Sequence, residues 1–263
     1  MRIFAPDYPR NEHGWIVFPS DMAWRKRLFP EGVFKHYAKM HLFLCQEIIS
    51  YVSKLGDTIL DPMAGTGTIM LAATMGRNVI CIDIEEGYHK IQCEVKATLE
   101  HEFPNMGHTI LLHGNCKLIL PIPCNHIIFS PPYANILKPS KSPSKFVTEK
   151  YRLDDNQYQM YAQTTGNVGL RNTFLYNQDM EKVYRLCYES LAPGGTMTVV
   201  IKDRIVDGVR VYLSKWVERV CTRIGFVNLE WYRHRMMGGA YQDVARSKGM
   251  ETVDEEDIMV FRK

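Results

Sequence analysis

The sequence lacks the features that define several large classes of protein. Its 263 residues contain no apolar run long enough to cross a bilayer, and the first segment, MRIFAPDYPRNEHGW, has no apolar core of the signal-peptide type. The seven cysteines are scattered and odd in number, without a CxxC pair or a CxxC…HxxxH spacing. These absences argue against a membrane protein, a disulfide framework and a structural zinc site. We therefore expect a soluble, cytoplasmic protein that holds no metal.

An excess of charge of one sign is also missing. The 32 Lys and Arg residues and 29 Asp and Glu residues give a formal net charge of +3, too small to indicate an anionic partner by itself. The apolar fraction of 46% is ordinary for a globular protein and argues against wholesale disorder. A chain of this length can bury a sizeable core, so we expect one domain over residues 1–263.

Helix-like and strand-like segments alternate along much of the chain. Apolar residues recur at helical spacing in 38–55, 67–75, 88–100, 177–191 and 211–224, with Asn177 as an expected N-cap. Strand composition is found in 58–61, 78–83, 109–113, 126–129, 196–201, 226–235 and 257–263. This alternation predicts an α/β fold with a mostly parallel, seven-stranded sheet and helices on both faces, in which the last two strands form a hairpin-like edge.

Three segments interrupt this pattern. Residues 1–38 are rich in Pro, aromatic and charged residues, and we expect an irregular arm with a few short turns. Residues 134–177 and 236–255 lack clear periodicity. Loops of this length inside a compact domain usually have a function or are mobile, and we interpret both as insertions that bind nucleic acid.

The segment LDPMAGTGT connects the first predicted strand to a helix. Small residues let the backbone approach a ligand closely, and the free N–H groups at a helix start favour an anion or carboxylate. No Gly-Lys-Ser/Thr follows, which excludes a P-loop, and Met70 stands where a dinucleotide fingerprint has its third small residue. Asp83 ends the next predicted strand, where a carboxylate can accept hydrogen bonds from ribose hydroxyls. Together these features favour an adenosine-containing ligand.

The segment SPPY follows the fourth predicted strand, at the sheet edge where doubly wound folds bind ligands. Its two prolines form a rigid exit that holds the Ser130 hydroxyl and the Pro131 carbonyl in place as acceptors. Tyr133 offers a flat face for a nucleobase, worth about 1–3 kcal/mol. Two acceptors beside a stacking surface suit an exocyclic amino group, whose lone pair they free from the ring. That nitrogen can then attack a methyl group on a sulfonium about 3–3.5 Å away.

DPMAGTGT and SPPY resemble motifs I and IV of the S-adenosylmethionine-dependent DNA amino-methyltransferases, which make N4-methylcytosine or N6-methyladenine. Residues 34–68 are similar to motif X running into motif I, and LAPGGTMTVVIKD resembles the stretch after motif IV, so the resemblance covers roughly 30–205. It implies a Rossmann-like class I methyltransferase fold with an antiparallel last strand. It also implies S-adenosylmethionine as cofactor, catalysis by Ser130, Pro131, Pro132 and Tyr133, and a cofactor site of Asp61, Met63, Gly65, Thr66, Gly67, Thr68, Asp83, Ile84 and Asn115. The family usually has Asp where this chain has Asn115.

The resemblance also implies a substrate. We expect methylation of an exocyclic amino group in double-stranded DNA, with the base flipped out and cytosine N4 favoured over adenine N6. Phosphate contacts are expected from two basic segments, through Lys138, Lys141, Lys145, Arg152, Arg233 and Arg235.

Some alternatives remain open and others do not. RNA guanine-N2 methyltransferases combine a similar glycine loop with PP[YF], so an RNA substrate is the alternative, and the resemblance leaves open a homodimer and a restriction endonuclease partner. Cys124 precedes the fourth predicted strand, which excludes it as a cytosine-C5 nucleophile. His36, Lys39 and His41 stand at a predicted helix start, which accounts for them without a role in the site.

Overall fold

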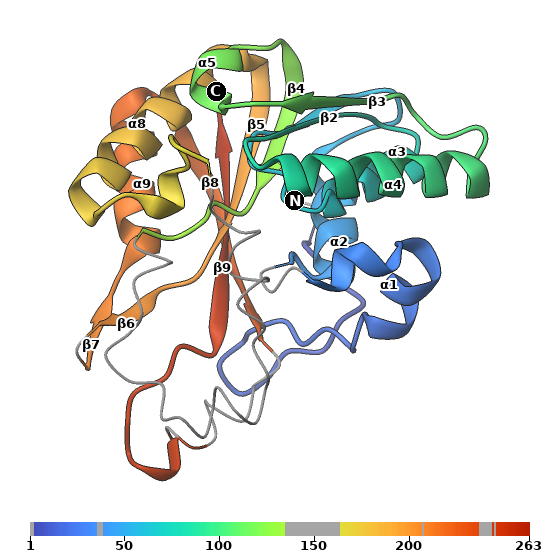
Figure 1. Cartoon of the computed structure of the whole chain (residues 1–263). Coiled ribbons are helices and arrows are strands. Elements are labelled where there is room, and N and C mark those ends of the chain that lie inside the picture. The colour runs from blue at the N-terminus through green and yellow to red at the C-terminus, as the bar shows by residue number, and fades with distance from the viewer. Residues whose placement is uncertain (1–2, 36–38, 135–163, 207, 237–243, 245) are drawn as a thin grey trace.

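A seven-stranded sheet runs through the centre of the molecule, with helices packed on both of its faces (Figure 1). The computed structural model describes residues 3–35, 39–134, 164–206, 208–236, 244 and 246–263. In sheet order the strands are β3 (Thr109–His113), β2 (Asn78–Asp83), β1 (Thr58–Asp61), β4 (Cys124–Phe129), β5 (Leu191–Ile201), β9 (Glu255–Arg262) and β8 (Val227–Arg235).

Strand direction confirms the predicted fold class. Strands β1 to β5 pair in parallel, and β9 is antiparallel to both of its neighbours, β5 and β8. The chain moves outward from β1 to β2 and β3, and then returns to place β4 on the other side of β1. This reversal opens a crevice beyond the carboxyl ends of β1 and β4, which is the usual ligand site in such sheets.

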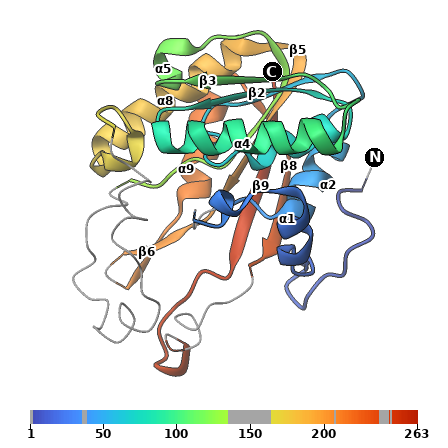
Figure 2. The same cartoon turned by 45° about the vertical axis from the view of Figure 1, so that its right-hand side comes forward.

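Two helical layers cover the sheet (Figures 1 and 2). One face carries α2 (Leu42–Val52), α3 (Leu71–Thr74) and α4 (Glu86–Glu102), and the other carries α5 (Cys116–Ile119), α8 (Thr173–Ser190) and α9 (Leu213–Ile224). Because side chains alternate along a strand, Ile59 packs in the first layer and Leu60 in the second. Burial on both faces explains why the strand segments are almost continuously apolar. Among the described residues, none of the helices is both long and apolar enough to span a membrane.

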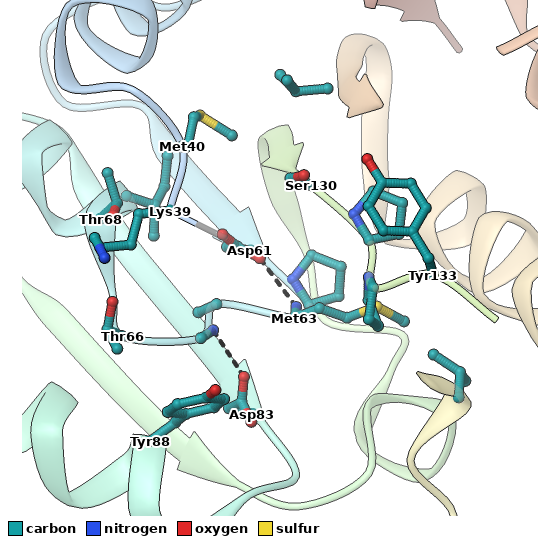
Figure 3. Close-up of a pocket in the computed structure, with 18 of the residues that line it drawn as sticks. Lys39, Met40, Asp61, Met63, Thr66, Thr68, Asp83, Tyr88, Ser130 and Tyr133 are labelled. Atoms are coloured by element: carbon teal, nitrogen blue, oxygen red, sulfur yellow. Dashed lines mark hydrogen bonds between the residues drawn. The ribbon is translucent and has the colours of Figure 1, made fainter. Parts of the chain in front are cut away.

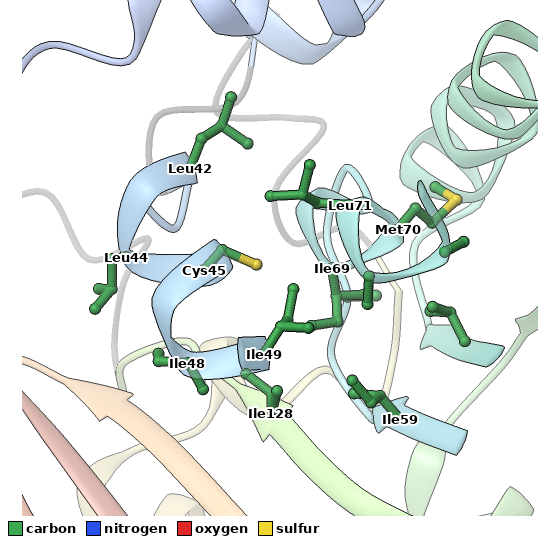
Figure 4. Close-up of a cluster of buried hydrophobic side chains, with 14 of the residues drawn as sticks. Leu42, Leu44, Cys45, Ile48, Ile49, Ile59, Ile69, Met70, Leu71 and Ile128 are labelled. Atoms are coloured by element: carbon green, nitrogen blue, oxygen red, sulfur yellow. The ribbon is translucent and has the colours of Figure 1, made fainter. Parts of the chain in front are cut away.

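The layer around α2 fixes the helical turn that follows the glycine loop. Cys45 and Ile49 of α2 lie against Ile69 and Leu71, and all four side chains are buried (Figure 4). Full burial of an aliphatic side chain of this size contributes about 1.5–3 kcal/mol relative to exposure. The glycine loop is therefore held from behind by a well-packed apolar cluster.

Several element boundaries differ from the sequence prediction. The helix expected from residue 38 begins at Leu42, whose N–H donates to Asp21 Oδ2 at 2.9 Å. The helix expected over 67–75 is a 3-10 turn, η2 (Thr68–Met70), followed by the single turn of α3. The predicted cap at Asn177 is wrong, because α8 begins four residues earlier and its N-cap Asn172 accepts the Leu175 N–H at 2.9 Å.

The N-terminal arm is more regular than predicted. It contains α1 (Met22–Leu28) and the 3-10 helix η1 (Glu31–Lys35). Ile16 also pairs with the edge strand β8, since its N–H donates to Arg233 O at 2.9 Å and its carbonyl accepts the Arg235 N–H at 2.8 Å. Two further elements were not predicted, the short antiparallel strands β6 (Arg204–Val206) and β7 (Val209–Val211). A 3-10 helix, η3 (Val168–Leu170), precedes α8.

Candidate functional site

A cavity of about 520 Å³ lies at the carboxyl ends of β1, β2 and β4, where the chain reverses its order in the sheet. It is lined by all four residues of SPPY and by eight of the nine predicted cofactor residues, Asp61, Met63, Gly65, Thr66, Thr68, Asp83, Ile84 and Asn115. Gly67 is absent from the lining. The two sets of residues that were predicted from separate motifs therefore meet at one cavity.

The glycine loop is fixed by hydrogen bonds to β2 and α4. The Gly65 N–H donates to Asp83 Oδ2 at 2.7 Å, and the Gly65 carbonyl accepts the Gln92 side-chain amide at 2.7 Å. Gly67 has a φ of +83°, and a Cβ there would collide with the end of the Met70 side chain. Gly67 thus contributes to the turn rather than to the cavity wall.

Two buried carboxyl groups lie on the floor of the cavity (Figure 3). Asp61 accepts the Met63 N–H at 2.9 Å, and Asp83 accepts the Glu85 N–H at 2.9 Å in addition to that of Gly65. Burial raises the pKa of Asp61 to about 8, and the nearby Asp83 adds to this. Burial likewise raises the pKa of Asp83 to about 7 against the effect of its N–H donors. Ionisation of these acids is favoured by a cationic or hydroxyl-rich ligand.

The SPPY corner is held rigidly at its far end. The Tyr133 hydroxyl accepts the Lys202 N–H at 3.0 Å, and the Tyr176 hydroxyl donates to the Pro132 carbonyl at 2.8 Å. Ser130 is half-buried and lines the cavity. Figure 3 shows Ser130 and Tyr133 on one side and Thr66, Thr68 and Asp83 on the other, with Asp61 and Met63 between them.

The segment that returns from the 134–177 insertion supplies another wall. Gly166, Asn167 and Val168 line the cavity, and buried Glu85 fastens this segment to the end of β2. The Glu85 carboxylate accepts the Asn167 side-chain amide at 2.7 Å and the Thr164 hydroxyl at 2.9 Å. A Cβ added at Gly166 would lie 3.1 Å from the Asn115 amide nitrogen, so this wall abuts the predicted adenine end.

Sequence reasoning missed part of the lining. Lys39 and His41, which had been attributed to a helix start, both line the cavity, whereas His36 lies outside the described residues. Burial lowers the pKa of Lys39 to about 8, and the charge of Arg25 lowers it further. The similarity of this segment to motif X was the signal that could have identified them. Phe18, Met40, Tyr88, His234 and Glu256 line the cavity as well.

The predicted phosphate-binding residues are only partly described. Lys138, Lys141, Lys145 and Arg152 lie outside the described residues. Arg235 is exposed and lines the cavity. The Arg233 side chain is 45% exposed and donates to buried Asp257 at 2.8 Å, so part of its charge is already compensated. Within the described parts of the chain, no group of three or more His, Cys, Asp or Glu side chains is placed to hold a metal.

The chain matches one protein family in sequence. Residues 10–94 match the sequence model of a family described as DNA methylase, which confirms the resemblance over this segment. The segment contains residues 10–38 of the arm, α2, the glycine loop and Asp83. No curated protein matches the chain.

Solved structures share the fold at low sequence identity. TrmN from Thermus thermophilus superposes with a TM-score of 0.53 at 14% identity over 90% of this chain, which spans only 52% of TrmN. A methyltransferase from Pyrococcus furiosus gives 0.52 at 13% identity over 92% and 94% of the two chains. A SAM-dependent methyltransferase from Methanosarcina mazei gives 0.50 at 12% identity over 82% and 96%. The chain therefore has the Rossmann-like methyltransferase fold, and its match to the DNA methylase family supports S-adenosylmethionine-dependent methyl transfer.

Proposed function

We propose that this protein transfers the methyl group of S-adenosylmethionine to an exocyclic amino group of a base in DNA, with cytosine N4 favoured over adenine N6. The observation that carries this proposal is the shared cavity, which is lined by the glycine loop and Asp83 on one side and by SPPY on the other. Only such a juxtaposition allows a one-carbon transfer between a cofactor and an amino group.

The cofactor half of the cavity suits S-adenosylmethionine. Asp83 has more lone pairs than its backbone donors use, so it can also accept hydrogen bonds from ribose hydroxyls. Buried Asp61 can ionise in response to a cationic ligand, and the backbone at Gly65 and Thr66 permits close approach. Asn115 lies beside Gly166 and Ile84, where it would contact the adenine ring. When bound, the cofactor supplies an electrophilic methyl group on its sulfonium.

The target half activates the amino group. The Ser130 hydroxyl and the Pro131 carbonyl would accept the two amino hydrogens and so localise the nitrogen lone pair. Tyr133, held at its hydroxyl by Lys202, would stack on the base and aim this lone pair. Held in this way, the amino nitrogen would attack the methyl carbon with loss of the C–S bond to the cofactor's thioether, and the alkylated nitrogen would then release a proton to water. No strong base is needed, because alkylation makes that nitrogen acidic.

DNA is proposed as the substrate because the family that matches residues 10–94 is described as DNA methylase. A base can reach a recessed cavity only after it leaves the duplex, so the proposal includes base flipping. A homodimer and a restriction endonuclease partner stay predictions from the resemblance.

The test is methyl transfer from labelled S-adenosylmethionine to DNA and to RNA, followed by mass spectrometry of the nucleosides. We expect label in N4-methyldeoxycytidine, or failing that in N6-methyldeoxyadenosine, and loss of the label with the Ser130→Ala variant. Ser130→Thr is the matched control, since it keeps a hydroxyl. Label in guanine N2 of RNA would establish the alternative substrate, and label only in protein would contradict both.

A further inference from the structure

Arg25 of α1 lies outside the cavity but is buried between two of its walls, with only 2% of its surface exposed. One guanidinium nitrogen donates to Asp21 Oδ2 and to the Met40 carbonyl, each at 2.7 Å. The other donates to the Thr68 hydroxyl at 3.3 Å. A single side chain thus connects α1, the segment before α2 and the start of η2.

Asp21 extends the same network. The oxygen that accepts from Arg25 also accepts the N–H of Leu42, the first residue of α2, at 2.9 Å. Burial acts to raise the pKa of Asp21, but the Leu42 N–H and the Arg25 guanidinium outweigh it and hold that pKa below its ordinary value. The pair is therefore ionic, with side chains that are 3% and 15% exposed.

The segments that this ion pair connects are parts of the cavity wall. Lys39, Met40 and His41 line the cavity on one segment and Thr68 lines it on the other. Figure 3 shows Lys39 and Met40 close to Thr68, on the same side of the cavity. Hydrogen bonds from Arg25 therefore connect these two parts of the wall directly, in addition to the apolar packing behind η2.

A purely structural role explains less of this geometry. If Arg25 only stabilised α1, its ion pair with Asp21 in the same helix region would be enough. A buried guanidinium is also costly unless all of its donors are paired. Here the additional hydrogen bonds are made to two lining residues, Met40 and Thr68. The planar guanidinium can serve acceptors on three segments in a fixed geometry, which a lysine ammonium cannot do.

We propose that Arg25 is a positioning residue for cofactor binding, which holds the wall formed by residues 39–41 against the start of η2. The inference rests on the proposed function, because it assigns this part of the cavity to the methionine end of S-adenosylmethionine. It adds a residue outside the motifs to the set that determines cofactor affinity.

The experiment compares Arg25→Lys with wild type in calorimetric titrations with S-adenosylmethionine and S-adenosylhomocysteine. We expect Kd for both to rise about tenfold, as for loss of one charge-assisted hydrogen bond, while KM for the nucleic acid stays within about twofold. Arg77→Lys is the matched control. Arg77 also joins separate segments, through Ser53 Oγ at 3.1 Å, Ser53 O at 3.0 Å and Met75 O at 2.7 Å, and it does not line the cavity. Arg77→Lys should lower Tm about as much as Arg25→Lys does, but it should leave the cofactor Kd unchanged.

Each outcome bears on one proposal. An unchanged cofactor Kd in Arg25→Lys, or an equal rise in Arg77→Lys, would overturn the positioning role while leaving the proposed function intact. Failure of the wild-type protein to bind either cofactor form would instead contradict the proposed function. If Arg25→Lys does not fold, Asp21→Asn replaces it, since it removes the charge that orients the guanidinium, and the same rise in Kd is expected.

Discussion

At the scale of single residues, Tyr133 has two contacts that substitutions can separate. The residue lines the cavity, and its hydroxyl accepts the Lys202 N–H at 3.0 Å. Tyr133→Ala removes the stacking surface, so we expect single-turnover methyl transfer to fall about 5- to 150-fold, the equivalent of about 1–3 kcal/mol. Tyr133→Phe keeps the ring and should lose only a few-fold, with cofactor affinity unchanged in both. Equal losses in the two variants would show that the hydroxyl, not the ring, is what matters.

The two cavity acids predict a pH dependence of cofactor binding. Burial raises the pKa of Asp61 to about 8 and that of Asp83 to about 7, so both carry protons near pH 6 in the cofactor-free protein. A cationic, hydroxyl-bearing ligand favours the ionised forms. Binding should therefore release protons, and affinity should rise from about pH 6 to 7, where Lys39, whose pKa burial lowers to about 8, still carries most of its charge.

Titration calorimetry in buffers of different ionisation enthalpy measures this release. Asp83→Asn should release about one proton fewer and bind more weakly, whereas an affinity that is flat over this range would contradict the assignment. The free energy of unfolding should depend on pH in the opposite direction from cofactor affinity. A carboxyl whose pKa is raised in the folded state contributes stability that is fully present below its ordinary pKa of 3.8 and is lost as pH rises from there to the folded pKa. The cofactor-free protein should therefore become progressively less stable up to about pH 7 to 8.

At the scale of elements, the Glu85 contacts allow a local test. Glu85 binds Thr164 and Asn167 from a segment about eighty residues further along the chain. Glu85→Ala should release residues 164–168, because their buried partner is lost, and KM for the cofactor should rise. Hydrogen exchange should become faster in this segment and stay unchanged in β1 and β4. Glu85→Gln, which keeps an acceptor, should lie between, and unchanged exchange in Glu85→Ala would refute the clamp.

The sequence predicts the elements whose pattern is local and misses those that depend on distant partners. Strands β1, β2 and β4 were recognised because both faces are buried, and their order along the chain sufficed to bring Asp83 and SPPY to one edge. The start of α2 was misplaced because its first N–H is bound by Asp21, which no local pattern shows. Strands β6 and β7 were missed because Val206 and Val209 are exposed and give no burial pattern.

The same distinction applies to the site. Glycines and prolines indicate backbone geometry directly, so the glycine loop and the SPPY segment could be identified from the sequence. Lys39 and His41 have no such signature, and only the fold brings them to the cavity.

At the scale of the whole molecule, both ends of the chain contribute to one edge. The arm pairs with β8 through Ile16, and Phe4 stacks on Tyr232 of that strand with ring centroids 4.7 Å apart. Two residues beyond Ile16, Phe18 lines the cavity, as does His234 on β8. The cavity therefore depends on the attachment of the arm as well as on the central strands.

This attachment can be tested by separating backbone from side chain at Ile16, which is 2% exposed. Ile16→Ala keeps both hydrogen bonds to β8 and should cost about 2–5 kcal/mol through lost packing. Ile16→Pro also removes the N–H that donates to Arg233 O, which leaves the edge of β8 partly unpaired. Because an open strand edge can pair with another chain, Ile16→Pro should self-associate more than wild type and bind cofactor more weakly, whereas Ile16→Ala should do neither.

Light scattering after size exclusion measures the self-association, and urea unfolding measures the stability. If Ile16→Pro matched Ile16→Ala in stability and association, the arm would be a passive cover and the pairing with β8 would have no part in shaping the cavity.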